Sequence, residues 1–350
     1  MTAQQKGEVM EKTLEKRPVT AAADHLHRTT IGGQALIEGI MMKGPEKTAM
    51  AVRVPDGSIT IEEKENKQKK WYNKAPFIRG VFNFVSQLAD GYYYLSRSAE
   101  LSGVDEDDGE EEMSKFEKWL DEKLGDKLMG VVMSIAMVLG IGLAIVLFVF
   151  VPTWLFMLVQ AIVGEGIDLS PWQSLFEGIL KIAIFITYMW LVSKTAAIRR
   201  TYEYHGAEHK TIACYEHGLE LTVENVKPQI RFHPRCGTSF IFLVLIISIL
   251  IYSIFPITNQ MFIDTFAVSE TMAMILRVSC KILLLPVIVS ISYEVIRLAG
   301  RYDNVLTRII SAPGLWLQRL TTKEPDASEI EAAIAAMKAV IPDDKESDKW

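Results

Sequence analysis

The pattern of apolar and polar positions divides the chain into four long apolar runs with charged segments around them. Residues 128–151 carry no charged side chain, and this length is sufficient for a helix that crosses a bilayer. Similar runs cover about 172–192, 240–255 and 271–296. Pro152 is expected to end or kink the first helix. The pattern therefore predicts an α-helical polytopic membrane protein with four transmembrane helices.

Basic residues are distributed unevenly between these runs. Residues 164–171 and 256–270 contain no Lys or Arg, whereas residues 194–239 and the segment after the fourth run contain several. Loops rich in Lys and Arg stay on the cytoplasmic side of a membrane. We therefore expect a multi-pass protein of the cytoplasmic (inner) membrane, with the central loop and both termini in the cytoplasm.

The segment before the first apolar run contains patterns of soluble structure. Residues 49–54 and 58–62 alternate in polarity around a Pro-Asp-Gly turn, which predicts a β-hairpin. Residues 76–99 repeat apolar positions at three- and four-residue intervals, which predicts an amphipathic helix that lies in a core or on the membrane surface. Gln34 and Glu38 are polar residues in apolar surroundings. They either point into a site or are ordinary exposed residues.

Four ionisable residues interrupt the second and fourth runs, namely Glu177, Lys181, Arg277 and Lys281. Such residues inside a bilayer indicate function by default. Because these four lie toward one end of their helices, we expect their side chains to extend to the nearby interface instead.

A last helix is predicted at 326–341. Asp326 precedes Glu329 by three residues, as in a capping box, and four apolar residues then follow at helical spacing. The soluble parts are expected to form a cytoplasmic α+β domain containing a small β-hairpin or sheet. The expected organisation is a disordered tail (1–27), an N-terminal region (28–127) with an acidic linker at 103–112, two transmembrane helices (128–193), a His- and Cys-rich loop (194–239), two further transmembrane helices (240–296) and a C-terminal tail (297–350).

Composition excludes some classes of protein. The 350 residues carry a formal net charge of −6, so no nucleic-acid-binding footprint is expected. The 3 cysteines form no disulfide framework. Charged residues make up 23% of the chain although its mean hydropathy is mildly positive, which fits charged soluble parts beside very apolar ones.

The central loop contains the motif with most chemical content. His205, Glu208 and His209 form H-x-x-E-H, and we expect them on a helix that continues the second transmembrane helix as far as Cys214. Two imidazoles one helical turn apart can share a divalent metal, and a nearby carboxylate can accept a proton from metal-bound water.

A second segment, residues 233–238, returns to the same membrane face with His233 and Cys236. Either residue, together with His205 and His209, would give three ligands and one open position, as in catalytic zinc sites; all four would close the site. Glu294 is a further candidate ligand. Two alternatives remain: the histidines bind phosphate headgroups, or Cys236 is a nucleophile with His233 as its base.

Five segments resemble the YqhQ-like family of bacterial membrane proteins, a domain of unknown function. They read IGGQALIEGIMMKGP, PFIRGVFNFVSQLADGYYYLSRSAE, YHGAEHKTIACYE, RFHPRCGTSF and APGLWLQRLTTKEP, and they lie in this order between Thr30 and Pro325. The resemblance implies a cytoplasmic domain attached to several membrane spans. It also implies a metal-dependent enzyme, as the family is loosely described, and places the family's motifs on His205, Glu208, His209, His233 and Cys236.

These observations lead to two expectations about function. The first is a membrane-embedded enzyme that depends on Zn²⁺ or another divalent metal, in which Glu208 acts as general base for hydrolysis at the cytoplasmic membrane face. The alternative is a non-catalytic assembly factor or adaptor, associated with the protein-insertion machinery or another membrane complex. Both have the lipid bilayer as a partner.

Overall fold

The structure is a computed structural model that describes residues 27–67, 70–103, 128–164, 166–167, 169–302, 304–344 and 346–349. Apart from His27 and Gly103, the tail predicted at 1–27 and the linker predicted at 103–112 lie outside these residues. The chain forms two compact units. The first unit comprises Met1–Val104, Met189–Phe240 and Tyr293–Trp350, and the second comprises Asp105–Tyr188 and Ile241–Ser292.

The first unit is built on a four-stranded antiparallel sheet with the strand order β1-β2-β3-β4. Its strands are β1 (Gly32–Leu36), β2 (Gly39–Lys43), β3 (Lys47–Arg53) and β4 (Ile59–Glu65). The predicted hairpin is confirmed as β3 and β4, where Arg53 pairs with Ile59 across the Pro-Asp-Gly turn. The first two strands extend this hairpin into a sheet.

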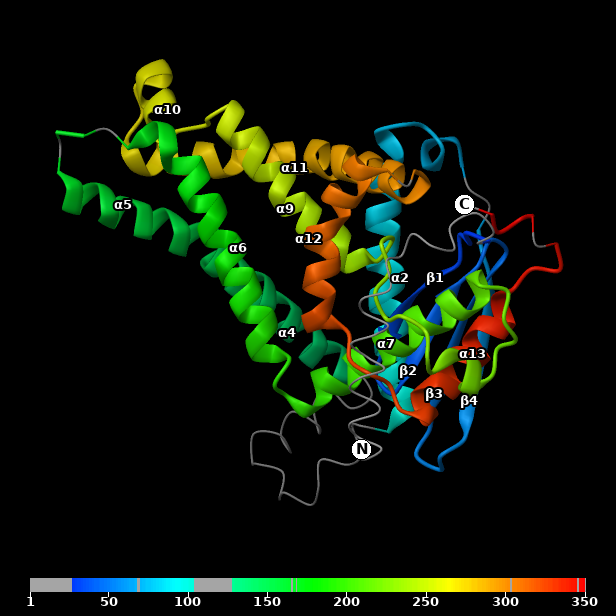
Figure 1. Cartoon of the computed structure of the whole chain (residues 1–350). Coiled ribbons are helices and arrows are strands. Elements are labelled where there is room, and N and C mark those ends of the chain that lie inside the picture. The colour runs from blue at the N-terminus through cyan, green and yellow to red at the C-terminus, as the bar shows by residue number, and fades with distance from the viewer. Residues whose placement is uncertain are drawn as a thin grey trace, which may run out of the picture. The chain divides into compact units, whose positions relative to one another are not determined.

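Alternate residues of the strands enter two different cores. Ile40, Met42, Ala49 and Ala51 contribute to a cluster with α7 (Ala196–Glu216) and α13 (Ala327–Val340). Leu36, Met41, Met50 and Val52 contact Tyr94 of α2 (Ile78–Ser102) on the opposite face. Because both faces of β2 and β3 are covered, these strands are buried except at Lys43, Lys47 and Arg53 at their ends. Figure 1 shows α7 and α13 beside each other against the sheet.

This unit also contains α8 (Val223–Val226), α12 (Val305–Thr321) and a short 3-10 turn at Trp71–Asn73. The capping box predicted for the last helix is present: the Asp326 carboxylate accepts from the backbone of Glu329, and the Glu329 side chain accepts from the backbone of Asp326. The first and last described segments also meet, because Thr29 pairs with Lys349 in an isolated β-bridge.

Among the described residues, four helical segments are long and apolar enough to cross a membrane: Val138–Val163, Gln173–Val192, Gly237–Ile254 and Glu270–Arg301. The first consists of parts of α4 (Leu128–Ile145), five π-helical residues (Val146–Phe150) and α5 (Val151–Val163); the others are α6, α9 and α11. Between α9 and α11 lies α10 (Asn259–Phe266). The chain is therefore a mostly helical protein with four candidate membrane spans.

Two helix boundaries differ from the prediction. The first apolar helix does not end at Pro152: the π-helical residues Val146–Phe150 precede this proline, and α5 continues beyond it to Val163. The second span does not continue to Cys214 as one helix. It ends at Val192 and α7 starts at Ala196, since the hydroxyls of Ser193 and Thr195 donate to nearby backbone carbonyl oxygens.

Three of the four ionisable residues in the second and fourth apolar runs, Glu177, Arg277 and Lys281, do not extend to an interface as expected. Glu177 and Arg277 are only 2% and 1% exposed, and they form an ion pair with an Oε1 to guanidinium distance of 2.8 Å. Lys281 approaches the other oxygen of Glu177 at 3.2 Å, and Thr153 accepts from Arg277 at 3.0 Å. The reason is that α5, α6 and α11 supply matching partners, which satisfies these charges internally.

Candidate functional site

Helix α7 presents two histidines to the same point. His205 and His209 are four residues apart, so the helix places them on one face, and their ring centroids are 4.4 Å apart. Both side chains are buried. Gly206 lets α7 approach the segment after α12 closely, because a Cβ there would come within 1.9 Å of the Lys323 carbonyl oxygen. The glycine of the motif therefore has a packing role.

Cys236 reaches this point from the residue before α9. The backbone leading to it is fixed by Gln318 of α12. The Gln318 side chain accepts from the His233 N–H at 2.8 Å and donates to the His233 carbonyl oxygen at 2.7 Å. A side-chain amide that satisfies both groups of one residue holds the return segment in a single position against α12.

His205, His209 and Cys236 together form a group that could hold a metal ion. One ring nitrogen of each histidine and the Cys236 sulfur all lie within 4.8 Å of one another. The Nε2 of His205 is 3.2 Å from the sulfur. The Nε2 of His209 is buried and forms no hydrogen bond within the part of the chain that the structure describes. Two imidazole nitrogens and a thiolate are donors typical of zinc, so these residues fit such an ion.

Backbone carbonyl groups orient both rings. The Nδ1 of His205 donates to the Thr321 carbonyl oxygen at 2.8 Å, and the Nδ1 of His209 donates to the Arg231 carbonyl oxygen at 2.5 Å. A carbonyl oxygen can only accept, so each Nδ1 carries a proton. When the rings are neutral, both Nε2 atoms therefore have a lone pair available for a ligand, as in metal-bound histidines.

The charges at the site favour a thiolate on Cys236. Burial alone would raise the pKa of this thiol, but His205 and His209 outweigh burial and hold the pKa well below its usual range. Burial alone would likewise lower the pKa of His205, but Cys236 and Glu208 outweigh it and raise this pKa to about 9. Without a metal, the site therefore contains the Cys236 thiolate beside the His205 imidazolium. A bound metal cation can supply the positive charge in place of the imidazolium.

Glu208 lies on the sheet side of this group. Its carboxylate accepts from the Gly33 N–H at 3.0 Å, and its side chain is 5% exposed. Burial raises the pKa of Glu208, while His209 and His205 oppose the shift. A carboxylate with a raised pKa beside a metal site is suited to accept a proton.

His233 is adjacent to the group but does not belong to it. Its ring centroid is 5.6 Å from that of His209. Its Nε2 faces away to accept from Arg235 at 3.2 Å, and Arg235 forms an ion pair with Glu216. Burial and the Arg235 charge lower the pKa of His233 well below its ordinary value. His233 is therefore a neutral ring beside the site.

The other three candidates from the sequence serve different contacts. The Gln34 side chain packs on α2, where a Cβ at Gly91 would come within 2.8 Å of its oxygen. Glu38, at a φ of 49° in the turn between β1 and β2, pairs with Arg200 of α7. Glu294 accepts from Arg79 at 2.8 and 2.5 Å at the start of α2. Among the described residues, none of the three joins the group of His205, His209 and Cys236.

Sequence reasoning missed the supporting residues. Thr321 and Arg231 contribute backbone carbonyl groups, which leave no signal in residue type. Gln318 can be identified as a supporting residue from the sequence only after α12 is recognised as a helix with a polar face. Gly33 is marked by the Gly-Gly pair at the start of β1, since two adjacent glycines indicate close backbone approach.

Comparison with known proteins gives one family. The family described as "Protein of unknown function (DUF1385)" matches residues 75–343, which include α7 and the return segment. The chain is also 34% identical over 316 residues to the uncharacterized protein YqhQ of Bacillus subtilis (strain 168), covering 89% of this chain and 92% of that protein. No solved structure matches the chain. The chain therefore belongs to the DUF1385 family.

Proposed function

We propose that this chain is a zinc-dependent hydrolase of the membrane, with His205, His209 and Cys236 as metal ligands. The observation that carries the proposal is that His205, His209 and Cys236 each offer a ligand atom within 4.8 Å of the other two, while the Nε2 of His209 is buried without a hydrogen bond among the described residues. A buried polar atom without a partner is costly, so a ligand is expected there. Three protein ligands leave one coordination position for water or substrate.

Each residue has a defined role in this proposal. Zinc would act as a Lewis acid on a substrate carbonyl group and lower the pKa of the attacking water. Glu208 would accept a proton from a water molecule at this site, because burial raises the pKa of its carboxyl group towards neutral pH. The Gly33 N–H holds the Glu208 carboxylate, and the carbonyl groups of Thr321 and Arg231 hold the two rings.

Amide or peptide bonds are the substrate class that the motif favours. H-x-x-E-H is found in zinc peptidases, and this part of the proposal rests on analogy with them. The positive-inside distribution of Lys and Arg supports a cytoplasmic location of the site.

Metal analysis tests the proposal. Protein purified in detergent and supplied with zinc is expected to carry one equivalent, and His209→Ala is expected to lose it. Glu208→Gln should retain the metal and lose hydrolysis of a panel of fluorogenic peptides. His217→Ala serves as the matched control, because His217 is an exposed histidine just after the same helix and should change neither property.

Cobalt(II) gives a second readout that does not need a substrate. A cobalt-loaded site with a thiolate ligand shows a sulfur-to-metal charge-transfer band, and this band should vanish in Cys236→Ser. Wild-type protein that takes up neither zinc nor cobalt at the site would refute the proposal.

One observation favours a second candidate function. The distance of 3.2 Å between Cys236 and His205 is that of a metal-free cysteine–histidine pair, in which Cys236 would be a nucleophile. The structure pairs the thiol with His205 and not with His233, the base considered from the sequence. Under this proposal the protein binds no metal, and an activity-based electrophile labels Cys236 in wild type but not in His205→Ala.

A further inference from the structure

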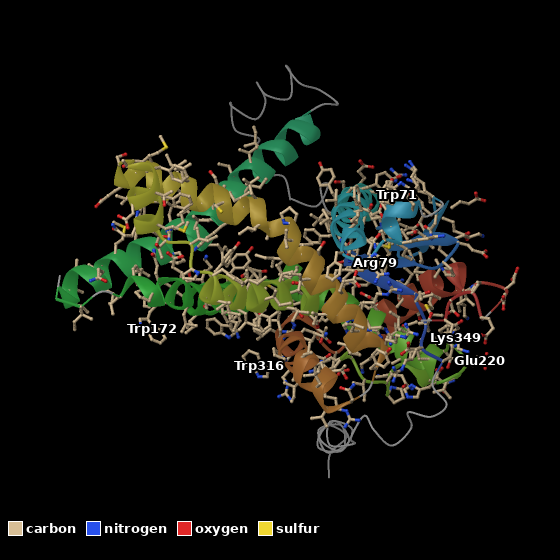
Figure 2. All side chains as sticks on the ribbon, turned by 90° about the horizontal axis from the view of Figure 1, so that it is seen from above. Trp71, Arg79, Trp172, Glu220, Trp316 and Lys349 are labelled. Atoms are coloured by element: carbon tan, nitrogen blue, oxygen red, sulfur yellow. The ribbon has the colours of Figure 1, made fainter. Side chains whose placement is uncertain are left out.

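Helix α12 buries several polar residues and exposes several large apolar ones. Its buried positions include Thr307, Gln318 and Thr321, whereas Val305, Leu306, Ile309 and Trp316 are 72%, 66%, 63% and 53% exposed. Figure 2 shows Trp316 on the side of α12 that points away from the sheet. A helix on the surface of a soluble protein places its apolar stripe toward the core. The exposed apolar residues of α12 therefore need another partner.

The helix cannot rotate to hide this stripe, because its polar face is already committed. The Gln318 amide donates to the His233 carbonyl oxygen and the Ser239 hydroxyl, at 2.7 and 2.9 Å. The Thr321 carbonyl oxygen accepts from His205. Gly314 lies so close to Ser239 that an added Cβ would come within 2.5 Å. These contacts fix the outward direction of the apolar stripe.

The position of α12 in the chain indicates what covers the stripe. The helix starts at Val305, shortly after the candidate span Glu270–Arg301 ends. Arg301 before the helix and Arg319 in its last turn are exposed. A helix with an apolar face, basic ends and a tryptophan, joined directly to a membrane span, has the features of a helix that lies in the membrane interface.

Helix α2 repeats this pattern in the same unit. Ile78, Phe82, Val85, Leu88 and Tyr92 are exposed at helical spacing, and the buried positions of α2 are Gly80, Gly91, Tyr94, Ser98 and Ser102. Phe84 contacts Phe240 near the start of candidate span α9, with ring centroids 5.6 Å apart. The start of α2 is thus also attached to a point where the chain enters a span.

We propose that α12 lies in the boundary between the headgroups and acyl chains of an anionic membrane. Its stripe, defined as Val305, Leu306, Ile309 and Trp316, enters the acyl region, and Arg319 contacts lipid phosphates. Basic residues at such a surface attract anionic lipids. The inference does not depend on the proposed enzymatic function. It places the group of His205, His209 and Cys236 directly behind a helix that contacts lipid.

Fluorescence quenching of full-length protein in lipid nanodiscs tests this placement. An environment-sensitive thiol label is attached to Ile309→Cys and, in a second variant, to Leu306→Cys. Lipids that carry a spin label near the headgroup should quench both labels several times more strongly than aqueous iodide does. Lipids with the spin label near the chain end should quench them less, because an interfacial helix is shallow.

Glu331→Cys on α13 is the matched control, because Glu331 is an exposed residue of the same unit that the proposal leaves in water. Its label should be quenched by iodide and not by spin-labelled lipid. Unsubstituted protein labelled in parallel gives the background from the native cysteines. If iodide quenches the labels at Leu306 and Ile309 as strongly as the label at Glu331, the proposal is wrong, and the stripe is instead a surface for another protein.

The role of charge is tested with Arg319→Glu in the Ile309→Cys background. In nanodiscs rich in phosphatidylglycerol, this substitution should reduce quenching by the shallow spin label. In nanodiscs of phosphatidylcholine alone it should have a much smaller effect, because no net lipid charge is present. Equal effects in both lipids would contradict the assigned contact with anionic headgroups.

Discussion

At the residue scale, Gly33 joins the sheet to the candidate metal site. Its N–H donates to Glu208, and a Cβ at this position would come within 2.6 Å of the Met41 carbonyl oxygen and 3.0 Å of the Glu208 side chain. The neighbouring Gly32 has nothing within 4 Å of such a Cβ. The structure therefore has space for a side chain at Gly32 and not at Gly33.

This difference gives a prediction. Gly33→Ala should lower the stability of the fold by about 1–3 kcal/mol, because a clash with backbone across the sheet cannot be relieved by a side-chain movement. Gly32→Ala should leave stability unchanged or raise it by up to about 1 kcal/mol, by restricting the unfolded chain. Thermal unfolding in detergent measures both. Similar losses for the two variants would contradict the close approach of the Met41 backbone on β2 to Gly33.

The sequence was informative about single residues where local spacing decides geometry. The interval between His205 and His209 predicted that they share a helical face, which they do. The choice between His233 and Cys236 could not be made from the sequence, because both lie on the same irregular return segment. Gln318 lies on another helix, 82 positions after Cys236. It fixes the backbone of this segment and so determines which of the two side chains joins the histidines of α7.

At the element scale, α13 starts with a carboxylate that is almost fully buried. Glu329 is 1% exposed and accepts from the Asp326 N–H at 2.7 Å. Burial raises its pKa from an ordinary value of 4.5 to about 7. The folded protein therefore binds this proton more tightly than the unfolded chain does. Stability from this group is present below pH 4.5 and is lost as pH rises from 4.5 to about 7.

Glu329→Gln should remove this pH dependence, since the amide still accepts from Asp326 but has no proton to lose. We expect the thermal midpoint of wild type to fall relative to that of the variant as pH rises through the same window. Glu331→Gln, at an exposed position on the same helix, should keep the slope of wild type. An unchanged slope in Glu329→Gln would show that another group is responsible.

Elements with strong local signals were predicted from the sequence, and the others depend on packing. The capping box of α13 and the turn between β3 and β4 are local features. The strands β1 and β2 do not alternate in polarity, because β2 is buried on both faces and β1 is rich in small residues. Helix α12 was missed although Asn304 and Thr307 form a capping box at its start.

At the scale of the whole molecule, the distribution of basic residues predicts one orientation in the membrane. In intact cells, a thiol reagent that does not cross the membrane should label Ile167→Cys, because the loop after α5 is expected outside. It should label Glu331→Cys only after the membrane is permeabilised. Ile167 and Glu331 are both exposed, so accessibility within the protein is matched. The reverse pattern would place the candidate site on the outer face.

The composition of the core around α7 has a consequence for biosynthesis. Its buried members come mainly from β2, β3, α7 and α13, and α13 is the last of these elements along the chain. The ribosome therefore releases α7 long before α13, and two candidate spans are synthesised in between. During this interval, the sheet and α7 have no partner for the surface that α13 later covers. The nascent protein can bury this surface only after α13 has been synthesised, so loss of α13 is expected to leave a chain with an uncovered core that is recognised and degraded.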